Sequence, residues 1–314
     1  MPELPVVVLN GPTASGKTSV AVELALRLGE LGMGAEVVNA DSMLVYRGMD
    51  IGTAKPTLSE RAGVPHHLID IFDVTEVASV AAFQSRARRQ FADCRSRGVV
   101  PILVGGSALY VHAILDEFAF PGTDPVVRGA LEAELAELGP HSLHTRLARI
   151  DPAAATSILP GNGRRIVRAL EVIALTGSYS VGLPAWDYAV SPAVQYGLDL
   201  PRDEVDRRIE QRVQRMWDAG FVDEVRGLVL RGLRQGRTAS RALGYRQILD
   251  YLDGISSEPE AMAATIAGTR RFARKQLGWF RRDPRIVWLP ATDGVTETIV
   301  ADLRGRLDRY TREG

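Results

Sequence analysis

The residues best suited to chemistry lie in a short loop near the N-terminus, from Gly11 to Thr18. The loop has the G-x-x-x-x-G-K-[ST] spacing of a phosphate-binding P-loop. An apolar, β-branched run precedes it and a helical pattern follows, so the strand–loop–helix context of the motif is present. Inward backbone N–H groups and a helix N-terminus attract phosphate. We therefore expect a diphosphate or triphosphate on Gly11, Pro12, Thr13, Ala14, Ser15, Gly16, Lys17 and Thr18.

Two side chains of this loop have distinct roles in such a site. Lys17 supplies a mobile positive charge to the phosphate oxygens. The Thr18 hydroxyl suits a Mg²⁺ ion shared with the phosphates. The motif therefore predicts a magnesium-assisted phosphate site with Thr18 as its metal ligand from the protein.

Polar residues follow two further apolar runs that we expect to be strands. Asp41 follows Ala35–Asn39, and Ser107 follows Val99–Val104 after a pair of glycines. Ligands of parallel α/β sheets bind beyond the carboxyl ends of the strands, so these residues should meet the P-loop. Asp41 then serves either as the metal-side acid of a small-molecule kinase or as a general base for an incoming nucleophile. The residue types alone leave both roles open.

The composition is that of an ordinary globular protein, with an uneven distribution of charge. The 314 residues are 46% hydrophobic and 24% charged, and the formal net charge is zero. Residues 200–290 nevertheless carry 18 basic and 12 acidic side chains, a local net charge of +6. Such a region is either a footprint for a phosphate backbone or a salt-bridged helical surface.

The cysteine content and the apolar segments bear on the compartment. Cys94 is the single cysteine, so no intramolecular disulfide can form, which fits a reducing cytosol. We see no signal peptide and no apolar stretch of membrane-spanning length. We therefore expect a cytoplasmic protein with no membrane partner.

Alternating strand and helix patterns predict an α/β fold with a P-loop parallel-sheet core flanked by helices. This core comprises residues 1–117 and 193–314. Residues 118–192 read as short helices without intervening strands, which predicts an all-helical insertion domain. In the second half of the core we expect helices over Ser240–Leu252 and Pro259–Arg282, and strands over Val194–Leu200 and Ile286–Leu289.

Several long blocks of sequence resemble the bacterial tRNA dimethylallyltransferases. They are the P-loop and the segments Asn39–Pro56, Pro65–Asp70, Leu103–Tyr110 and Arg241–Arg246. The resemblance implies transfer of a dimethylallyl group from dimethylallyl diphosphate to N6 of adenine 37 in tRNA, the base beside the anticodon. The P-loop would then hold the diphosphate of an allylic donor, with Mg²⁺ as the cofactor.

The same resemblance implies roles for individual residues. The catalytic group comprises Asp41 as the general base, with Lys17, Thr18 and Ser107. Ser107 stands where the family usually has threonine, and Leu44 where many members have glutamine. Either Arg208 or Arg212, which share one face of a predicted helix, would bind the donor diphosphate.

The implied partner is the anticodon stem-loop of tRNA, bound by a chain that we expect to be a monomer. The implied tRNA contacts are Asp41, Ser42, Met43, Leu44, Ser107, Arg128, Arg164, Arg165, Arg168, Arg241, Gly244, Tyr245, Arg246, Arg274, Lys275, Gln276, Trp279 and Arg281. Two alternatives remain enzymatic: a P-loop small-molecule kinase and a prenyltransferase for free adenine nucleotide. A nucleotide-gated RNA-binding protein without activity would leave Asp41 without a role.

Overall fold

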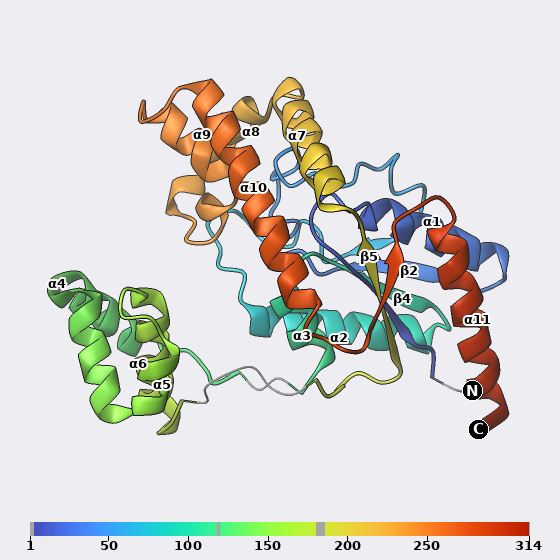
Figure 1. The fold of residues 1–314 in the computed structure, drawn as a ribbon, viewed down its shortest axis with the longest axis horizontal. Coiled ribbons are helices and arrows are strands. Elements are labelled where there is room, and N and C mark those ends of the chain that lie inside the picture. The colour runs from blue at the N-terminus through green and yellow to red at the C-terminus, as the bar shows by residue number, and fades with distance from the viewer. Residues whose placement is uncertain (1–2, 118–119, 180–185, 314) are drawn as a thin grey trace. The chain divides into compact units, whose positions relative to one another are not determined.

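The computed structural model describes residues 3–117, 120–179 and 186–313 of the chain (Figure 1). The chain divides into two compact units. The core unit comprises Met1–Asp116 and Tyr188–Gly314, and the insertion unit comprises Glu117–Asp187. Within the described residues, none of the helices combines the length and the apolar character needed to cross a bilayer.

The core unit is built on a six-stranded, all-parallel sheet, which confirms the predicted α/β class. The strand order is β3-β2-β4-β1-β5-β6, with every neighbouring pair parallel. The strands are β1 (Val6–Asn10), β2 (Ala35–Asn39), β3 (His66–His67), β4 (Val100–Val104), β5 (Ala193–Asp199) and β6 (Ile286–Pro290). The central position of β1 places the P-loop near the middle of one sheet edge.

Side chains of β1 alternate between two apolar layers, as the period of a strand requires. Val6 and Val8 join the layer that contains Phe83 and Phe91, whereas Val7 and Leu9 join the layer of helix α1. Both faces of the sheet are therefore covered, and the strands read as continuous apolar runs.

Helix α1 (Lys17–Glu30) and helix α11 (Val295–Glu313) contribute to one layer. Helix α2 (Val80–Ser96) and helix α3 (Ala108–Leu115) contribute to the other. In α1 the buried residues recur at helical spacing and are Ala21, Val22, Leu24, Ala25 and Leu28. The helix ends before Gly32, whose φ is 80°. These packed layers make the strand ends a rigid platform for the site.

A cluster of helices follows β5 and is drawn in yellow and orange in Figure 1. It comprises α7 (Arg202–Asp218), α8 (Phe221–Leu230), α9 (Tyr245–Leu252) and α10 (Glu258–Phe280). The expected continuous helix over Ser240–Leu252 is wrong, because only a short 3₁₀ turn (Ala239–Arg241) precedes α9. Gly244 has φ of 86°, and a Cβ there would lie 2.6 Å from the Phe221 ring, so the chain turns where Gly244 packs closely.

The regular elements among the described residues of the insertion unit are all helices. It contains α4 (Pro125–Ile150), α5 (Pro152–Ser157) and α6 (Gly163–Thr176), and Gly139 kinks α4 with φ of 77°. Its own core includes Leu131, Leu143, Leu147, Ile166 and Leu170. The predicted segment 118–192 includes 118–119 and 180–185, which lie outside the described residues. Residues 188–192 belong to the core unit, where Ala189 and Val190 donate backbone hydrogen bonds to the Leu115 carbonyl.

Candidate active site

A cavity of about 970 Å³ opens where the carboxyl ends of β1, β2 and β4 meet helices α7 and α10. The P-loop lines it from Thr13 to Thr18, and Asp41 lines it beyond β2. Gly105 and Gly106 line it beyond β4. The structure therefore brings together the three strand ends that the sequence analysis expected to converge.

The P-loop keeps its shape through several unusual backbone conformations. Gly11 has φ of 150°, and a Cβ on it would lie 2.9 Å from the Ser15 hydroxyl oxygen. Gly16 has φ of 89° and is the N-cap residue of helix α1. Ala14 has φ of 63°, a left-handed conformation that costs a non-glycine residue about 1–2 kcal/mol. Such a conformation persists only where neighbouring contacts hold the loop in place.

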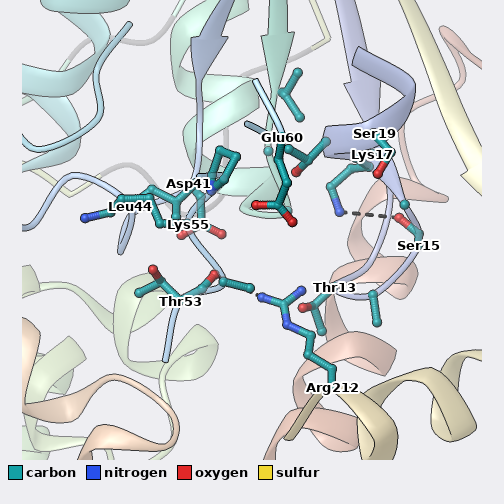
Figure 2. A pocket seen from close by; sticks show the side chains of 18 of the residues that line it. Thr13, Ser15, Lys17, Ser19, Asp41, Leu44, Thr53, Lys55, Glu60 and Arg212 are labelled. Atoms are coloured by element: carbon teal, nitrogen blue, oxygen red, sulfur yellow. Dashed lines mark hydrogen bonds between the residues drawn. The ribbon is translucent and has the colours of Figure 1, made fainter. Parts of the chain in front are cut away.

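Lys17 and Thr18 occupy the first turn of α1, at the positive end of the helix dipole. The Lys17 Nζ atom donates to the Pro12 carbonyl at 2.6 Å and to the Ser15 hydroxyl at 3.4 Å, the second of which is drawn in Figure 2. Burial lowers the pKa of Lys17 to about 7, while the Asp41 carboxylate opposes this shift and Arg212 adds to it. The charge on Lys17 is therefore sensitive to the groups that face it.

Asp41 is held by its own turn at the end of β2. Its backbone N–H donates to the Asn39 side-chain oxygen at 2.7 Å, and its Oδ1 accepts the Met43 N–H at 2.8 Å. The Asn39 amide also donates to the carbonyls of Asp41 and Leu68. This network leaves Oδ2 of a half-buried carboxylate beside the cavity, where it can accept a proton.

The glycine pair after β4 permits two close approaches. A Cβ on Gly105 would lie 2.6 Å from the Ala40 backbone, so this turn packs against the residue before Asp41. A Cβ on Gly106 would lie 2.5 Å from Gln276 Nε2. Ser107 follows as the N-cap of α3, half-buried, next to the two lining glycines.

The structure separates the two arginines that the sequence analysis left as alternatives. Arg212 extends from α7 to lie near Thr13 and Thr53 in Figure 2, and its Nη2 donates to the Thr53 carbonyl at 2.9 Å. Burial lowers the pKa of Arg212, and the Asp41 carboxylate opposes this shift. The Arg212 guanidinium therefore interacts electrostatically with both Asp41 and Lys17. Arg208 also lines the cavity, but its Nε donates to Glu204 at 2.6 Å and its side chain is 38% exposed.

One acidic residue that the sequence analysis missed anchors the loop beyond Asp41. The Glu224 carboxylate accepts the backbone N–H groups of Asp50, Ile51 and Gly52 at 3.0, 2.6 and 3.2 Å. It also accepts the Tyr245 hydroxyl at 2.6 Å. These hydrogen bonds hold the segment Asp50–Gly52 against helix α8, so Glu224 fixes this wall of the cavity.

Other lining residues were also missed as individual site residues. Thr53 and Lys55 line the cavity, and so does Glu60, which points into it in Figure 2. Lys55 Nζ donates to Asp50 and Asp70 and to the Tyr46 carbonyl at 2.8 Å, so it braces the segment. Thr53 and Lys55 belong to the Asn39–Pro56 block. The family resemblance runs over the whole of this block, and that length was the signal that its later residues also belong to the site.

The expected tRNA contacts in the core unit differ in exposure. Arg241, Arg246, Arg274, Lys275 and Arg281 are exposed, while Ser42, Met43, Leu44 and Trp279 are half-buried. Two of the expected contacts, Tyr245 and Gln276, have side chains that face inward. Tyr245 is fully buried and bonded to Glu224, and Gln276 is 5% exposed. Gly244, which is also buried, sets the turn before α9.

The expected contacts in the insertion unit also fall into two kinds. Arg128 and Arg168 both pair with Glu171, whose side chain has no exposed surface. Arg168 also donates to the carbonyls of Pro121 and Gly122. These two guanidiniums therefore stabilise the unit by balancing a buried charge. Arg164 and Arg165 are exposed in the first turn of α6.

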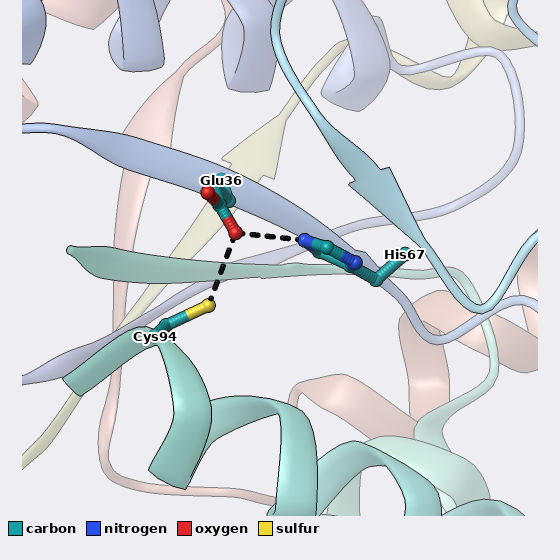
Figure 3. Close-up of side chains that lie close together, drawn as sticks. All are labelled: Glu36, His67 and Cys94. Atoms are coloured by element: carbon teal, nitrogen blue, oxygen red, sulfur yellow. Dashed lines mark hydrogen bonds and ion pairs between the residues drawn. The ribbon is translucent and has the colours of Figure 1, made fainter. Parts of the chain in front are cut away.

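A second cluster of polar side chains lies away from the cavity, between β2, β3 and α2 (Figure 3). Glu36 Oε2 lies 2.8 Å from His67 Nε2 and 3.4 Å from Cys94 Sγ. Arg97 donates to both Glu36 oxygens, which lowers the pKa of Glu36 to about 2. Burial raises the pKa of Cys94 to about 11, so the thiol stays protonated. The Glu36 carboxylate is already neutralised by Arg97, and the arrangement fits a structural hydrogen-bond network rather than a metal site.

Comparisons with known proteins agree with the resemblance found in the sequence. A family model described as IPP transferase matches residues 44–283. A tRNA dimethylallyltransferase of Kineococcus radiotolerans is 62% identical, with 93% of both chains covered. One of Thermobifida fusca is 61% identical over 91% of this chain and 89% of that protein. The crystal structure of the full-length tRNA isopentenylpyrophosphate transferase of Bacillus halodurans matches with a TM-score of 0.72 and 41% identity over 98% of both chains.

Proposed function

This chain belongs to the IPP transferase family, and we propose that it transfers the dimethylallyl group of dimethylallyl diphosphate to N6 of adenine 37 in tRNA. The observation that carries the proposal is the meeting of the P-loop, Asp41 and Arg212 around one cavity. A phosphate-binding loop at one wall and a carboxylate at another suit a reaction in which diphosphate leaves as a proton is removed.

The donor end of the reaction uses the positive groups of the cavity. Lys17, Arg212 and the N-terminus of α1 face the position expected for the diphosphate. As the bond between C1 of the dimethylallyl group and the diphosphate oxygen breaks, negative charge builds on that oxygen. Positive groups already in place stabilise this charge without reorganising, which lowers the barrier.

A divalent cation fits the same end of the cavity. The Thr18 hydroxyl lines the cavity beside Lys17, on an exposed residue at the start of α1. Mg²⁺ typically takes one or two protein oxygens and completes its shell with phosphates and water. Thr18 would hold the ion, which when bound would neutralise part of the diphosphate charge.

At the acceptor end, the N6 nitrogen of adenine forms its new bond to C1 of the dimethylallyl group. The amine proton then passes to Asp41, whose orientation is set by Asn39 and the Met43 N–H. The adenine must leave the stack of the anticodon loop to reach this cavity. Exposed cations on α10 and the first turn of α6 provide phosphate contacts of the kind that position an RNA backbone.

We also propose that the chain acts as a monomer, because one chain supplies the residues at both ends of the cavity. Its proposed compartment is the cytoplasm, where tRNA is available. A kinase or a prenyltransferase for free adenine nucleotide would not need the exposed cations of the two units. The distinguishing experiment offers unmodified tRNA and AMP in parallel, with dimethylallyl diphosphate and Mg²⁺. Prenyladenosine in tRNA digests supports the proposal. Prenyl-AMP without tRNA modification, or phosphate transfer from ATP, would replace it with an alternative.

A further inference from the structure

Helix α10 reaches the P-loop through one buried side chain. Gln276 Oε1 accepts the Thr13 N–H at 2.9 Å, and its Nε2 donates to the Gly106 carbonyl at 2.7 Å. A single amide therefore joins the loop after β1 to the turn after β4. Gln276 is 5% exposed and lines the cavity, so its side chain faces the cavity and not the outer surface of α10.

The Thr13 bond falls at the point where the P-loop is strained. Ala14, the next residue, holds the left-handed φ of 63°. Because the Thr13 N–H donates to Gln276, the amide of helix α10 helps to hold the P-loop backbone in this shape. The glycine at 106 lets the Gln276 amide approach, since a Cβ would lie 2.5 Å from Nε2.

We propose that Gln276 is a positioning residue for donor binding, which holds the P-loop and the Gly105–Gly106–Ser107 turn in register from the inner face of α10. This proposal deepens and rests on the proposed function, because it assigns Gln276 to the donor diphosphate and not to tRNA. Its neighbours Arg274 and Lys275 are exposed. Helix α10 therefore directs Gln276 towards the site proposed for dimethylallyl diphosphate and directs two cations towards solvent.

The test measures two binding constants for Gln276→Met and Gln276→Asn in the full chain. Inorganic diphosphate with Mg²⁺ probes the P-loop by calorimetry, and filter binding without donor probes tRNA. Methionine fills the space but lacks the amide, whereas asparagine keeps the amide but is too short to reach both partners. Gln214→Met, on an exposed residue of α7, makes the same chemical change outside the cavity and serves as the control.

We expect the dissociation constant for diphosphate to rise about tenfold in both Gln276 variants, the effect expected when a hydrogen-bonded loop amide is deprived of its partner. The tRNA dissociation constant should stay within about twofold, and Gln214→Met should match the wild type. Weakened tRNA binding with unchanged diphosphate binding would overturn the proposal and make Gln276 an RNA contact. Unchanged diphosphate binding in both variants would overturn it too.

These outcomes are independent of prenyl transfer. A wild-type chain that binds diphosphate but never prenylates tRNA would refute the proposed function, while the diphosphate measurement would still decide the role of Gln276. Thermal unfolding of each variant shows whether it is folded. If Gln276→Met does not fold, Gln276→Asn carries the measurement.

Discussion

The Nη2 atom of Arg212 lies 2.9 Å from the Thr53 carbonyl oxygen, so helix α7 is tied directly to the loop beyond Asp41. The same guanidinium faces Lys17 and Asp41 across the cavity. Arg208, one turn earlier on α7, is paired with Glu204. The donor diphosphate should therefore depend on Arg212 far more than on Arg208.

Replacing Arg212 with methionine should raise the dissociation constant for dimethylallyl diphosphate by about 10- to 100-fold, the effect typical of removing a charged hydrogen bond. Arg208→Met should change it by less than about threefold, because the Arg208 guanidinium is already paired with Glu204 and is partly exposed to solvent. Calorimetric titration with the donor and Mg²⁺ compares the two variants. Equal effects, or a larger effect in Arg208→Met, would reverse this assignment.

Asp41→Asn should slow the chemical step while leaving the local fold intact. The asparagine oxygen can still accept the Met43 N–H, but the side chain can no longer take the N6 proton. We expect the single-turnover rate to fall about 10²- to 10⁴-fold, the usual range for removal of a general base. Rates measured with enzyme in excess over tRNA separate chemistry from binding. Full turnover by this variant would remove Asp41 from the mechanism.

Donor affinity should depend on pH through Lys17. Its pKa of about 7 is set by burial, and a bound diphosphate raises it, so binding takes up a proton above pH 7. Affinity should therefore fall as pH rises from 7, by up to about tenfold per unit, until the pKa of the bound form is reached. Calorimetric titrations in buffers of different ionisation enthalpy measure how many protons are taken up when the donor binds.

The control for that pH dependence is Lys17→Arg, since arginine remains charged over the whole range. This variant should keep only the dependence due to the donor's own ionisation. If its proton uptake and pH profile match those of the wild type, Lys17 is not the titrating group.

Glu224→Gln should destabilise the wall formed by Asp50, Ile51 and Gly52. The carboxylate now accepts hydrogen bonds from three backbone N–H groups. In the variant the glutamine NH₂ group, which is itself a donor, would face some of these N–H groups. We expect the free energy of unfolding to fall by about 1–3 kcal/mol, the cost of leaving buried donors unpaired. Denaturant unfolding beside Glu137→Gln, an exposed site, measures the difference. Equal stability of the two variants would show that Glu224 does not anchor this loop.

The arginines of the insertion unit should separate into RNA-binding and stabilising residues. Joint replacement of Arg164 and Arg165 by glutamine should weaken tRNA binding and lower the salt slope by about one for each phosphate that the pair neutralises. Arg128→Gln should instead cost about 1–3 kcal/mol of stability, because buried Glu171 loses one charged partner while Arg168 remains. Salt titration of tRNA binding tests the Arg164 and Arg165 variant, and denaturant unfolding tests Arg128→Gln. Loss of stability in the first variant and loss of tRNA binding alone in the second would contradict this division.

The sheet and the P-loop wall of the cavity were predictable because their sequence signals are local. An apolar run followed by a P-loop motif places a strand, a loop and a helix within a few residues of each other. The break before α9 was not predictable, because the residues around Gly244 are buried at helix-like spacing. At Gly244 the chain turns with φ of 86° and packs against the Phe221 ring, a contact between distant parts of the sequence.

The inward direction of Tyr245 and Gln276 could not be read from the motifs that contain them. A motif marks a segment but does not say which face of the segment meets solvent. Glu224 was missed for a related reason, since its partners at Asp50–Gly52 are far away in the sequence. The choice of Arg212 over Arg208 likewise required the position of Thr53.

The most direct measurement is to locate the product of the reaction. Unmodified tRNA is incubated with the chain, labelled dimethylallyl diphosphate and Mg²⁺, then digested and mapped by mass spectrometry. A single dimethylallyl group on the adenosine 3′ of the anticodon, with one diphosphate released per group, is the predicted result. A tRNA that stays unmodified in the presence of the folded wild-type chain, or that carries the label at another position, would contradict the proposed function.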